Sequence, residues 1–195
     1  MNEFSRRAFV FCGAVGVSAT VFFSVNKLAS YALAEAPEQE SPQPSVMIVE
    51  FDDDGRRLRS VTREKLRKTR DEWKKQLSLD SYRVTRLAGT EAPESGELTH
   101  EHRDGLFRCI CCGNAVFASS AKFESGTGWP SFWEPIAAEN LYEKMDASLG
   151  MVRREVKCTL CDAHLGHVFT DGPDPTGLRY CMNSVALRFF PKAMS

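Results

Sequence analysis

The sequence predicts a mainly β domain of antiparallel sheets with short helices on its N-terminal side. After Gly105, short strand-like runs alternate with Gly, Pro and Asp turn residues, a pattern typical of antiparallel sheets rather than of βαβ units. The length of 195 residues fits one such domain with appendages. The expected strands are Leu106–Cys109, Ala115–Phe117, Val152–Lys157, Val168–Phe169 and Leu178–Phe190.

The first 34 residues have the composition of an export signal. Arg6 and Arg7 precede an apolar run, and Ala32-Leu33-Ala34 supplies the small residues of a cleavage site. Paired arginines before an apolar run resemble the twin-arginine signal of bacteria. We therefore expect residues 1–34 to direct export to the periplasm or cell envelope, and the mature chain to start near Glu35.

The alternative for this segment is a membrane anchor formed by residues 8–25, because the run is about as long as the shortest bilayer span. Its Gly, Ser and Thr residues make it a weak span, which favours cleavage. Cleavage would remove three basic residues and one acidic residue and change the net charge from −1 to −3. A chain without basic excess lacks the charge that binds phosphate backbones, so nucleic acid is not the expected partner.

Residues 35–45, EAPEQESPQPS, are rich in Pro, Glu and Gln and predict a flexible linker. Residues 46–67 form an N-terminal extension. In it, Val46–Phe51 alternates like a strand, Asp54-Gly55 is a turn signal, and Arg56–Ser60 returns as a hairpin strand.

A helical period covers Thr62–Leu77, with Leu66, Trp73 and Leu77 along one side. It predicts a surface helix docked by Trp73. The main domain is expected to span residues 68–192.

Four cysteines form two pairs in which two residues separate the thiols: Cys109 with Cys112, and Cys158 with Cys161. A CxxC turn points both sulfurs at one ion, so two such turns predict a tetrahedral site with one structural zinc per chain. Four sulfurs would leave no open position, so this metal would not be the catalyst. The alternatives are disulfides in an oxidising space and a thioredoxin-like redox pair. Export after folding would let zinc bind first, and a redox pair would need a βαβ context.

A further cysteine, Cys181, lies in the strand-like stretch GLRYCMNSVALRFF. The alternation of a strand places Arg179, Cys181 and Asn183 on one face. A guanidinium favours the nucleophilic thiolate, and an amide orients a polar substrate. The alternative is a small buried hydrophobe, but burial of Arg and Asn without partners would be costly.

Upstream, CDAHLGHVFTDG brings His164, His167 and Asp171 close together in the sequence. In an uninterrupted strand His164 and His167 would face opposite sides, but Gly166 permits a bulge that turns both rings one way. We interpret them as general acids or substrate-positioning groups. They could also be spare zinc ligands, although four sulfurs already complete the coordination sphere.

The stretch SGTGWPSFW combines glycines with Trp129, Phe132 and Trp133. A glycine-rich loop of this kind can present aromatic walls to a small apolar group, which makes Trp129 and Phe132 candidate substrate-binding residues. The alternative is an ordinary aromatic core cluster.

Together these motifs, in this order from about Glu72 to Pro191, resemble the methionine-R-sulfoxide reductases, the B-type peptide methionine sulfoxide reductases. The resemblance implies a β-tent of two antiparallel sheets and reduction of the R epimer of methionine sulfoxide, free or within proteins. It implies that Cys181 attacks the sulfoxide sulfur and that Trp129 packs against the substrate methyl group. The remaining implied roles are oxygen binding and protonation by His164, His167, Asp171, Arg179 and Asn183, and zinc binding by Cys109, Cys112, Cys158 and Cys161.

The chain departs from many members of this family at Thr127, where they carry a resolving cysteine. Cys12 would be removed with the signal, and Cys111 lies between two zinc ligands. We therefore expect a thioredoxin-like or small-molecule thiol to reduce the sulfenic acid that Cys181 would form, with Cys111 as the internal alternative. The protein is expected to act as a monomer. Its rivals in function are a zinc-knuckle interaction module without chemistry and a disulfide oxidoreductase.

Overall fold

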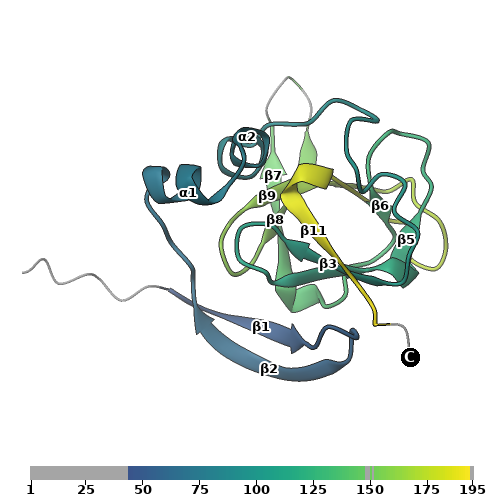
Figure 1. Cartoon of the computed structure of the whole chain (residues 1–195). Helices are drawn as coiled ribbons and strands as arrows, with labels where there is room; N and C mark the ends of the chain where they lie inside the picture. The colour runs from purple at the N-terminus through teal and green to yellow at the C-terminus, as the bar shows by residue number, and fades with distance from the viewer. Residues whose placement is uncertain (1–43, 148–149, 151, 194–195) are drawn as a thin grey trace, which may run out of the picture. The chain divides into compact units, whose positions relative to one another are not determined.

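The structure is a computed structural model that describes residues 44–147, 150 and 152–193 (Figure 1). The predicted export signal, the alternative anchor at residues 8–25 and nearly all of the linker lie outside the described residues. Within the part that is described, helices are too short or too polar to cross a membrane.

The N-terminal extension forms the predicted hairpin. Strands β1 (Ser45–Phe51) and β2 (Arg57–Glu64) pair antiparallel, and Gly55 takes a φ of +83° in the turn between them. A buried amide joins this hairpin to the rest of the chain: Asn140 Oδ1 accepts from Val49 N–H at 2.7 Å, and its Nδ2 donates to Val49 O at 2.9 Å. The extension therefore docks on the domain that follows it.

The helical region differs from the prediction at both ends. Residues 62–64 of the expected helix belong to β2, and the helix α1 spans only Arg70–Gln76. Thr69 sets the start of α1, because its side chain and that of Glu72 form a capping box. Trp73 is buried, as predicted. A second helix that the sequence analysis did not find, α2 (Leu79–Leu87), begins at the N-cap residue Ser78.

Two antiparallel sheets form the main domain, so the predicted mainly β class is confirmed (Figure 1). The larger one contains, in spatial order, β5 (Lys122–Phe123), β6 (Ser131–Phe132), β10 (Arg179–Met182), β9 (His164–Phe169), β8 (Arg153–Cys158) and β7 (Leu141–Asp146). The smaller one contains β11 (Leu187–Pro191), β3 (Gly105–Cys109) and β4 (Ala115–Ala118). Short 3₁₀ turns occupy Ser119–Ala121, Ala138–Asn140 and Ser184–Ala186.

The expected single strand Leu178–Phe190 is two strands in different sheets. Strand β10 ends at Met182, the turn Ser184–Ala186 follows, and β11 then pairs with β3. The carboxylate of Glu91 holds this turn, because it accepts hydrogen bonds from the backbone N–H groups of Ser184 at 2.6 Å and Val185 at 2.9 Å. This one turn thus carries the chain from the larger sheet to the smaller one.

Three fully buried aromatic rings lie in the core where the two sheets meet. Phe117 of β4 stacks on Phe132 of β6 with ring centroids 4.2 Å apart, and Phe107 of β3 meets Phe132 edge-on at 4.9 Å. Tyr180 and Met182 of β10 join the same core. Because side chains of a strand alternate, Cys181 between them points to the opposite face of the sheet.

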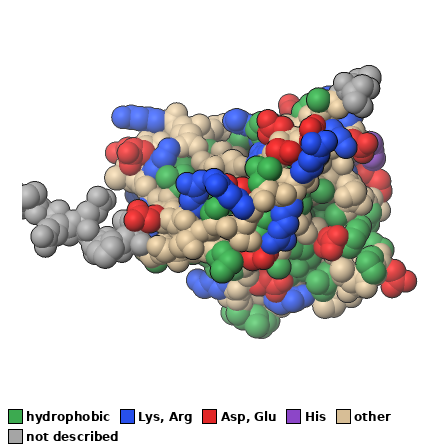
Figure 2. All heavy atoms as spheres, turned by 90° about the horizontal axis from the view of Figure 1, so that it is seen from below, with side chains coloured by type: hydrophobic (Ala, Val, Ile, Leu, Met, Phe, Trp, Pro, Cys, Tyr) green, Lys and Arg blue, Asp and Glu red, His purple; other side chains and the backbone are tan. Residues whose placement is uncertain are grey.

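Charged side chains of both signs share the surface. On the face seen in Figure 2, Lys and Arg side chains lie next to Asp and Glu side chains. On the hairpin, Glu50 forms ion pairs with both Arg59 and Arg63. This mixture agrees with the net charge close to zero of the sequence.

Candidate active site

The four cysteines of the two CxxC turns come together, as the spacing predicted. Their sulfur atoms all lie within 4.8 Å of one another, with 3.7 Å between Cys109 and Cys161 and 3.5 Å between Cys112 and Cys158. Tetrahedral coordination with Zn–S bonds of about 2.3 Å requires sulfur atoms roughly 3.8 Å apart. The four thiols therefore fit a metal such as zinc.

The backbone brings each pair of sulfurs together in the same way. Gly113 N–H donates to Cys109 O at 2.8 Å, and Asp162 N–H donates to Cys158 O at 2.9 Å. Gly113 and Asp162 take φ values of +76° and +57°, so both turns close with a left-handed residue directly after the second cysteine.

Cys181 lies elsewhere, in the middle of the larger sheet. It is opposite Ser131 on β6 and opposite His167 on β9. Its half-buried side chain opens into a cavity of about 180 Å³, whose lining also includes Trp129, His167 and Asn183. Three of the predicted site residues thus meet the predicted nucleophile in one small space.

Opposing influences act on the Cys181 thiol. Burial raises its pKa above the ordinary value, while the Thr127 hydroxyl, the positive charge of Arg179 and the Ser131 hydroxyl act in the opposite direction. Burial dominates, so the resting thiol is mostly protonated at neutral pH.

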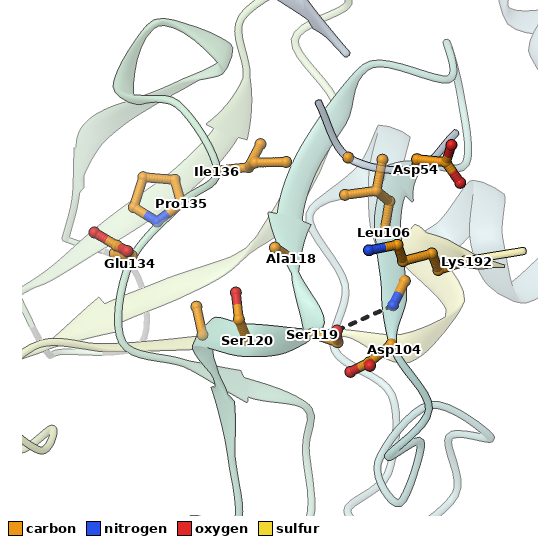
Figure 3. A pocket seen from close by; sticks show the side chains of 13 residues that line it. Asp54, Asp104, Leu106, Ala118, Ser119, Ser120, Glu134, Pro135, Ile136 and Lys192 are labelled. Atoms are coloured by element: carbon orange, nitrogen blue, oxygen red, sulfur yellow. Dashed lines mark hydrogen bonds between the residues drawn. The ribbon is translucent and has the colours of Figure 1, made fainter. Parts of the chain in front are cut away.

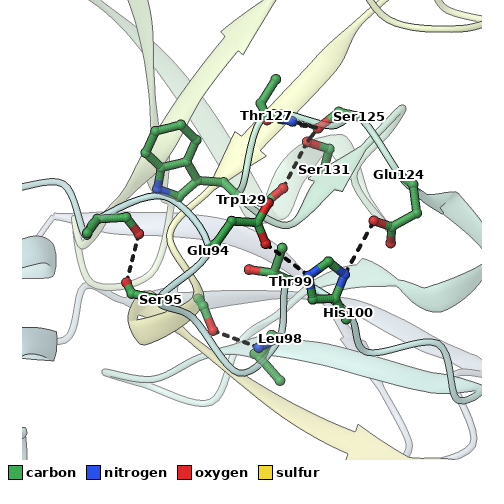
Figure 4. Close-up of polar contacts among 12 residues, drawn as sticks. Glu94, Ser95, Leu98, Thr99, His100, Glu124, Ser125, Thr127, Trp129 and Ser131 are labelled. Atoms are coloured by element: carbon green, nitrogen blue, oxygen red, sulfur yellow. Dashed lines mark hydrogen bonds and ion pairs between the residues drawn. The ribbon is translucent and has the colours of Figure 1, made fainter.

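A chain of hydroxyl groups begins with Thr127 next to this thiol and continues through Ser125 and Ser131; Figure 4 shows these three residues. Thr127 Oγ1 is 3.9 Å from Cys181 Sγ and 2.8 Å from Ser125 Oγ, which in turn is 2.8 Å from Ser131 Oγ. Ser131 donates to the Trp129 carbonyl at 3.2 Å, and a carbonyl can only accept. Ser125 must then donate to Ser131, and Thr127 to Ser125, so that Thr127 accepts from the thiol. When the thiol ionises, rotation of the Thr127 hydroxyl alone provides a donor to the thiolate.

Arg179 and Asp171 form a two-point ion pair. Arg179 Nε is 2.9 Å from Asp171 Oδ1, and Nη2 is 2.8 Å from Oδ2. The guanidinium also lies over the Phe169 ring, 4.6 Å from its centroid. The hydrogen bond from Arg179 lowers the pKa of Asp171, whose side chain is 62% exposed. Asp171 thus contacts the site through Arg179 and does not line the cavity.

The two histidines share one side of β9, as the sequence analysis expected. A bulge between β8 and β9 skips Leu165 in the pairing, and the ring centroids of His164 and His167 lie 5.3 Å apart. Gly166 is required there, because a Cβ at this position would overlap the carbonyl oxygen of Cys181.

Each histidine has its own carboxylate. His167 Nε2 is 2.9 Å from Asp146 Oδ2, and His164 Nδ1 is 2.8 Å from Glu155 Oε1. His167 lines the cavity, whereas His164 is 2% exposed and packs behind it. Burial lowers the pKa of His164, so its ring is neutral at neutral pH.

Asn183 and Trp129 are tied together through Glu91. Trp129 Nε1 donates to Glu91 O at 3.2 Å, and Glu91 N–H donates to Asn183 Oδ1 at 3.0 Å. Asn183 Nδ2 donates to Leu165 O at 3.0 Å. The amide of Asn183, expected to face a substrate, therefore also fastens the tryptophan segment to the histidine strand.

Phe132 does not lie where the sequence analysis expected it. Its side chain is 0% exposed and stacks in the core on Phe117, so it is not a wall of the cavity. Within SGTGWPSFW, residue 131 starts strand β6, and alternation then turns Phe132 toward the core and Ser131 toward the thiol.

A larger hollow of about 510 Å³, shown in Figure 3, is lined by residues such as Asp54, Asp104, Ser119 and Lys192. It contains neither cysteine nor histidine. A cysteine and a histidine meet instead in the cavity at Cys181, which His167 also lines.

The antiparallel fold, the Cys181 thiol beside Arg179, and a separate cluster of four cysteines that fits a metal together indicate the class of the protein, an oxidoreductase. Its family follows from comparison with known proteins. The SelR domain family matches residues 77–191, and the chain belongs to this family of peptide methionine sulfoxide reductases.

Three relatives carry the name peptide methionine sulfoxide reductase MsrB. The protein of Pseudomonas fluorescens is 57% identical over 129 residues, which cover 66% of this chain and 99% of the relative. The protein of Pseudomonas putida is 55% identical over 128 residues, with 66% and 98% covered. The protein of Herminiimonas arsenicoxydans is 55% identical over 126 residues, with 65% and 92% covered. The enzyme class expected from the sequence is thereby confirmed.

Proposed function

We propose that this enzyme reduces the R epimer of methionine sulfoxide, free or within oxidised proteins, through a sulfenic acid on Cys181. One observation carries the proposal: the Cys181 thiol opens into a cavity of about 180 Å³ that Trp129 also lines. A cavity of this size has room for the methyl sulfoxide end of one side chain. The family of the chain supports the same reaction.

The reaction balances within the enzyme and one substrate. The Cys181 sulfur attacks the sulfoxide sulfur, the S–O bond of the substrate breaks, and an S–O bond forms on Cys181. The substrate sulfur gains the two electrons that the cysteine sulfur loses. The thiol proton ends on the sulfenic acid oxygen, and methionine leaves.

Residues around the cavity bind and protonate the substrate in this proposal. Trp129 packs against the methyl group. When the His167 ring carries both protons, Nε2–H is donated to Asp146 at 2.9 Å, and Nδ1–H remains for the sulfoxide oxygen. Arg179, held by Asp171, stabilises the thiolate, and His164 packs behind His167 and orients it. Asn183 contributes to the cavity wall beside the oxygen.

Thiols from outside the chain regenerate Cys181. A first thiol condenses with the sulfenic acid and releases water, and a second thiol reduces the mixed disulfide to the free cysteine. Thr127 is the side chain next to the sulfur, so no resolving cysteine is present in that loop. Cys111 is 3% exposed within the first CxxC turn, which supports a thioredoxin-like protein or a small thiol as reductant.

One zinc ion held by Cys109, Cys112, Cys158 and Cys161 is the proposed cofactor. Bound zinc would cross-link the end of β3 to the end of β8 and would take no part in the thiol chemistry. We further propose that the protein works as a monomer in the periplasm or cell envelope. In this proposal residues 1–34 direct its export, and residues 35–45 form a linker between this signal and the rest of the chain.

Reduction of racemic methionine sulfoxide with dithiothreitol tests the proposal. Consumption should stop at one half of the substrate, and the separated R epimer should account for all of it. The Cys181→Ser variant should be inactive, while Cys111→Ser should match the parent. Consumption of the S epimer, or an active Cys181→Ser variant, would contradict the proposal. No consumption of either epimer by the parent would instead favour a zinc-knuckle interaction module without chemistry.

Thiol mapping separates the reductants. After reaction with methionine sulfoxide and without reductant, mass spectrometry should find Cys181 as a sulfenic acid that dimedone labels. A Cys111–Cys181 disulfide in high yield would refute the external reductant. About one zinc per chain in the same sample would exclude a disulfide oxidoreductase that uses a CxxC pair.

A further inference from the structure

A second group of metal-ligating side chains lies on the surface, formed by residues other than the four cysteines. His100, His102 and Glu124 each offer a ligand atom, and these atoms all lie within 4.8 Å of one another. His100 Nδ1 is 3.7 Å from Glu124 Oε2, and His102 Nε2 is 3.7 Å from Glu124 Oε1. We propose that these three residues bind a divalent transition-metal cation of the nickel, zinc or copper class.

The donor set selects this class of cation. Two imidazoles with one carboxylate suit Zn²⁺, Ni²⁺ and Cu²⁺, whereas Ca²⁺ and Mg²⁺ take oxygen ligands. The side chains of His100, His102 and Glu124 are 67%, 65% and 51% exposed, so water can fill the remaining coordination positions. A hollow of about 270 Å³ lined by His102, Lys122 and Glu124 provides the room.

Independent support comes from the His100 ring nitrogen Nε2, which points away from Glu124. It lies 2.9 Å from Glu94 Oε2, and Nδ1 of the same ring is turned toward Glu124 (Figure 4). A carboxylate on one imidazole nitrogen fixes the tautomer and orients the other nitrogen as a metal ligand. Glu94 thus takes the place that such a carboxylate occupies behind metal-bound histidines.

The local charge also favours a cation. The group includes two carboxylates, Glu94 beside His100 and Glu124, and one ammonium group, Lys122, whose Nζ is 3.1 Å from Glu124 Oε1. With neutral imidazoles the group carries a net charge of about −1, because Glu101 is paired with Arg103. Lys122 Nζ also donates to Thr99 O at 2.6 Å, which holds the two ligand segments together before any ion binds.

The site borders the active-site loop without entering its cavity. Glu94 N–H donates to Gly128 O at 2.8 Å, and Glu124 directly precedes Ser125 of the hydroxyl chain. A bound cation would therefore join residues 94–102 to the loop that carries Thr127 and Trp129. The proposed cation does not depend on the proposed sulfoxide reaction, and it is no part of the thiol chemistry.

Nickel titration of the untagged, zinc-loaded chain tests this site. The Cys181→Ser background removes the reactive thiol as a competing ligand, and the titration is followed by calorimetry at neutral pH. We expect one Ni²⁺ per chain, with at least tenfold weaker binding when His100 and His102 are both replaced by Asn. Glu94→Gln should weaken binding by about tenfold or more, because it removes only the orienting carboxylate. Glu97→Gln, an exposed glutamate of the same segment, is the matched control and should bind as the parent does.

Nuclear magnetic resonance locates the bound ion independently of the heat of binding that calorimetry measures. Paramagnetic Ni²⁺ should broaden the backbone amide signals of residues 99–102 and 124 first, and those of the four-cysteine centre should keep their width. Absence of binding at millimolar nickel, equal affinity in the double Asn variant, or broadening centred on other residues would each overturn the proposal. Zinc content and circular dichroism confirm that every variant is folded.

Discussion

Replacement of Thr127 by Val removes the hydroxyl nearest to the Cys181 sulfur and keeps the shape of the side chain. Thr127 Oγ1 lies 3.9 Å from Sγ, and by rotation its hydroxyl can either accept from the thiol or donate to the thiolate. Donation to a charged sulfur is the stronger interaction, so the hydroxyl lowers the pKa of Cys181. Its loss should raise that pKa further above the ordinary value.

The size of the effect follows from the distance. A hydrogen bond to a charged group contributes about 1.5 to 3 kcal/mol, and a contact of this length belongs near the lower limit. About 1.5 kcal/mol corresponds to roughly one pKa unit. At a pH below the pKa of Cys181 in both proteins, kcat/KM should then fall about tenfold, because the thiolate fraction falls by that factor. Well above both pKa values the two proteins should have the same rate.

The assay is the pH profile of kcat/KM for an oxidised methionine peptide with saturating dithiothreitol. Thr127→Ser keeps the hydroxyl and is the matched control, so its profile should follow the parent. If the Val profile coincides with the parent, or if Ser is displaced as far as Val, the hydroxyl does not act on the thiolate and the reasoning fails.

Three further changes test the histidine, the strand contact and the metal centre. Because burial lowers the pKa of His164, the unfolded chain takes up a proton first as the pH falls below about 6.5. The free energy of unfolding from urea titrations should therefore fall more for the parent than for His164→Asn over that range; parallel curves would contradict this. Gly166→Ala places a Cβ 2.9 Å from the Met182 Cα and should destabilise the protein by about 3 kcal/mol or more, measured by thermal unfolding. Gly177→Ala, whose added Cβ meets open space at a φ of +67°, should cost only about 1 to 2 kcal/mol, and equal losses would argue against the steric account. Cys158→Ser should lose the metal and several kcal/mol of stability, since zinc contributes about 10 to 16 kcal/mol in small zinc domains. Full zinc content by atomic absorption in that variant would refute the centre.

The sequence predicted those parts of the site that depend on short-range spacing. Two residues between cysteines were enough to identify the four sulfurs, and Asp54-Gly55 was enough to identify the hairpin turn. Alternation along residues 179–182 correctly separated Cys181 from the core side chains Tyr180 and Met182. Each of these signals acts within one turn or one strand, so no tertiary contact was needed to interpret it.

Signals that depend on partner strands were missed. Asp146 reaches His167 across a separation of 21 residues, and Glu91 binds the backbone of Ser184 across 93 residues. The sequence around an isolated Asp or Glu does not indicate which distant residue its carboxylate will contact. Phe132 was misplaced for the same reason, because the face of a two-residue strand is decided by β5 and β10 on either side of it.

The geometry of the cavity is set largely from outside it. Glu91 holds the turn after β10 through its carboxylate and Trp129 through its carbonyl oxygen, and its N–H donates to Asn183. Burial raises the pKa of Glu91, while the two backbone N–H groups that it accepts stabilise its charge. The tryptophan wall, the cavity amide and the exit of the strand that carries Cys181 are therefore all held by one residue, Glu91, through its backbone and its carboxylate, and Glu91 does not line the cavity. This preorganisation favours substrate binding, because Trp129 is already ordered in the folded protein and its ordering adds no entropic cost when a substrate binds.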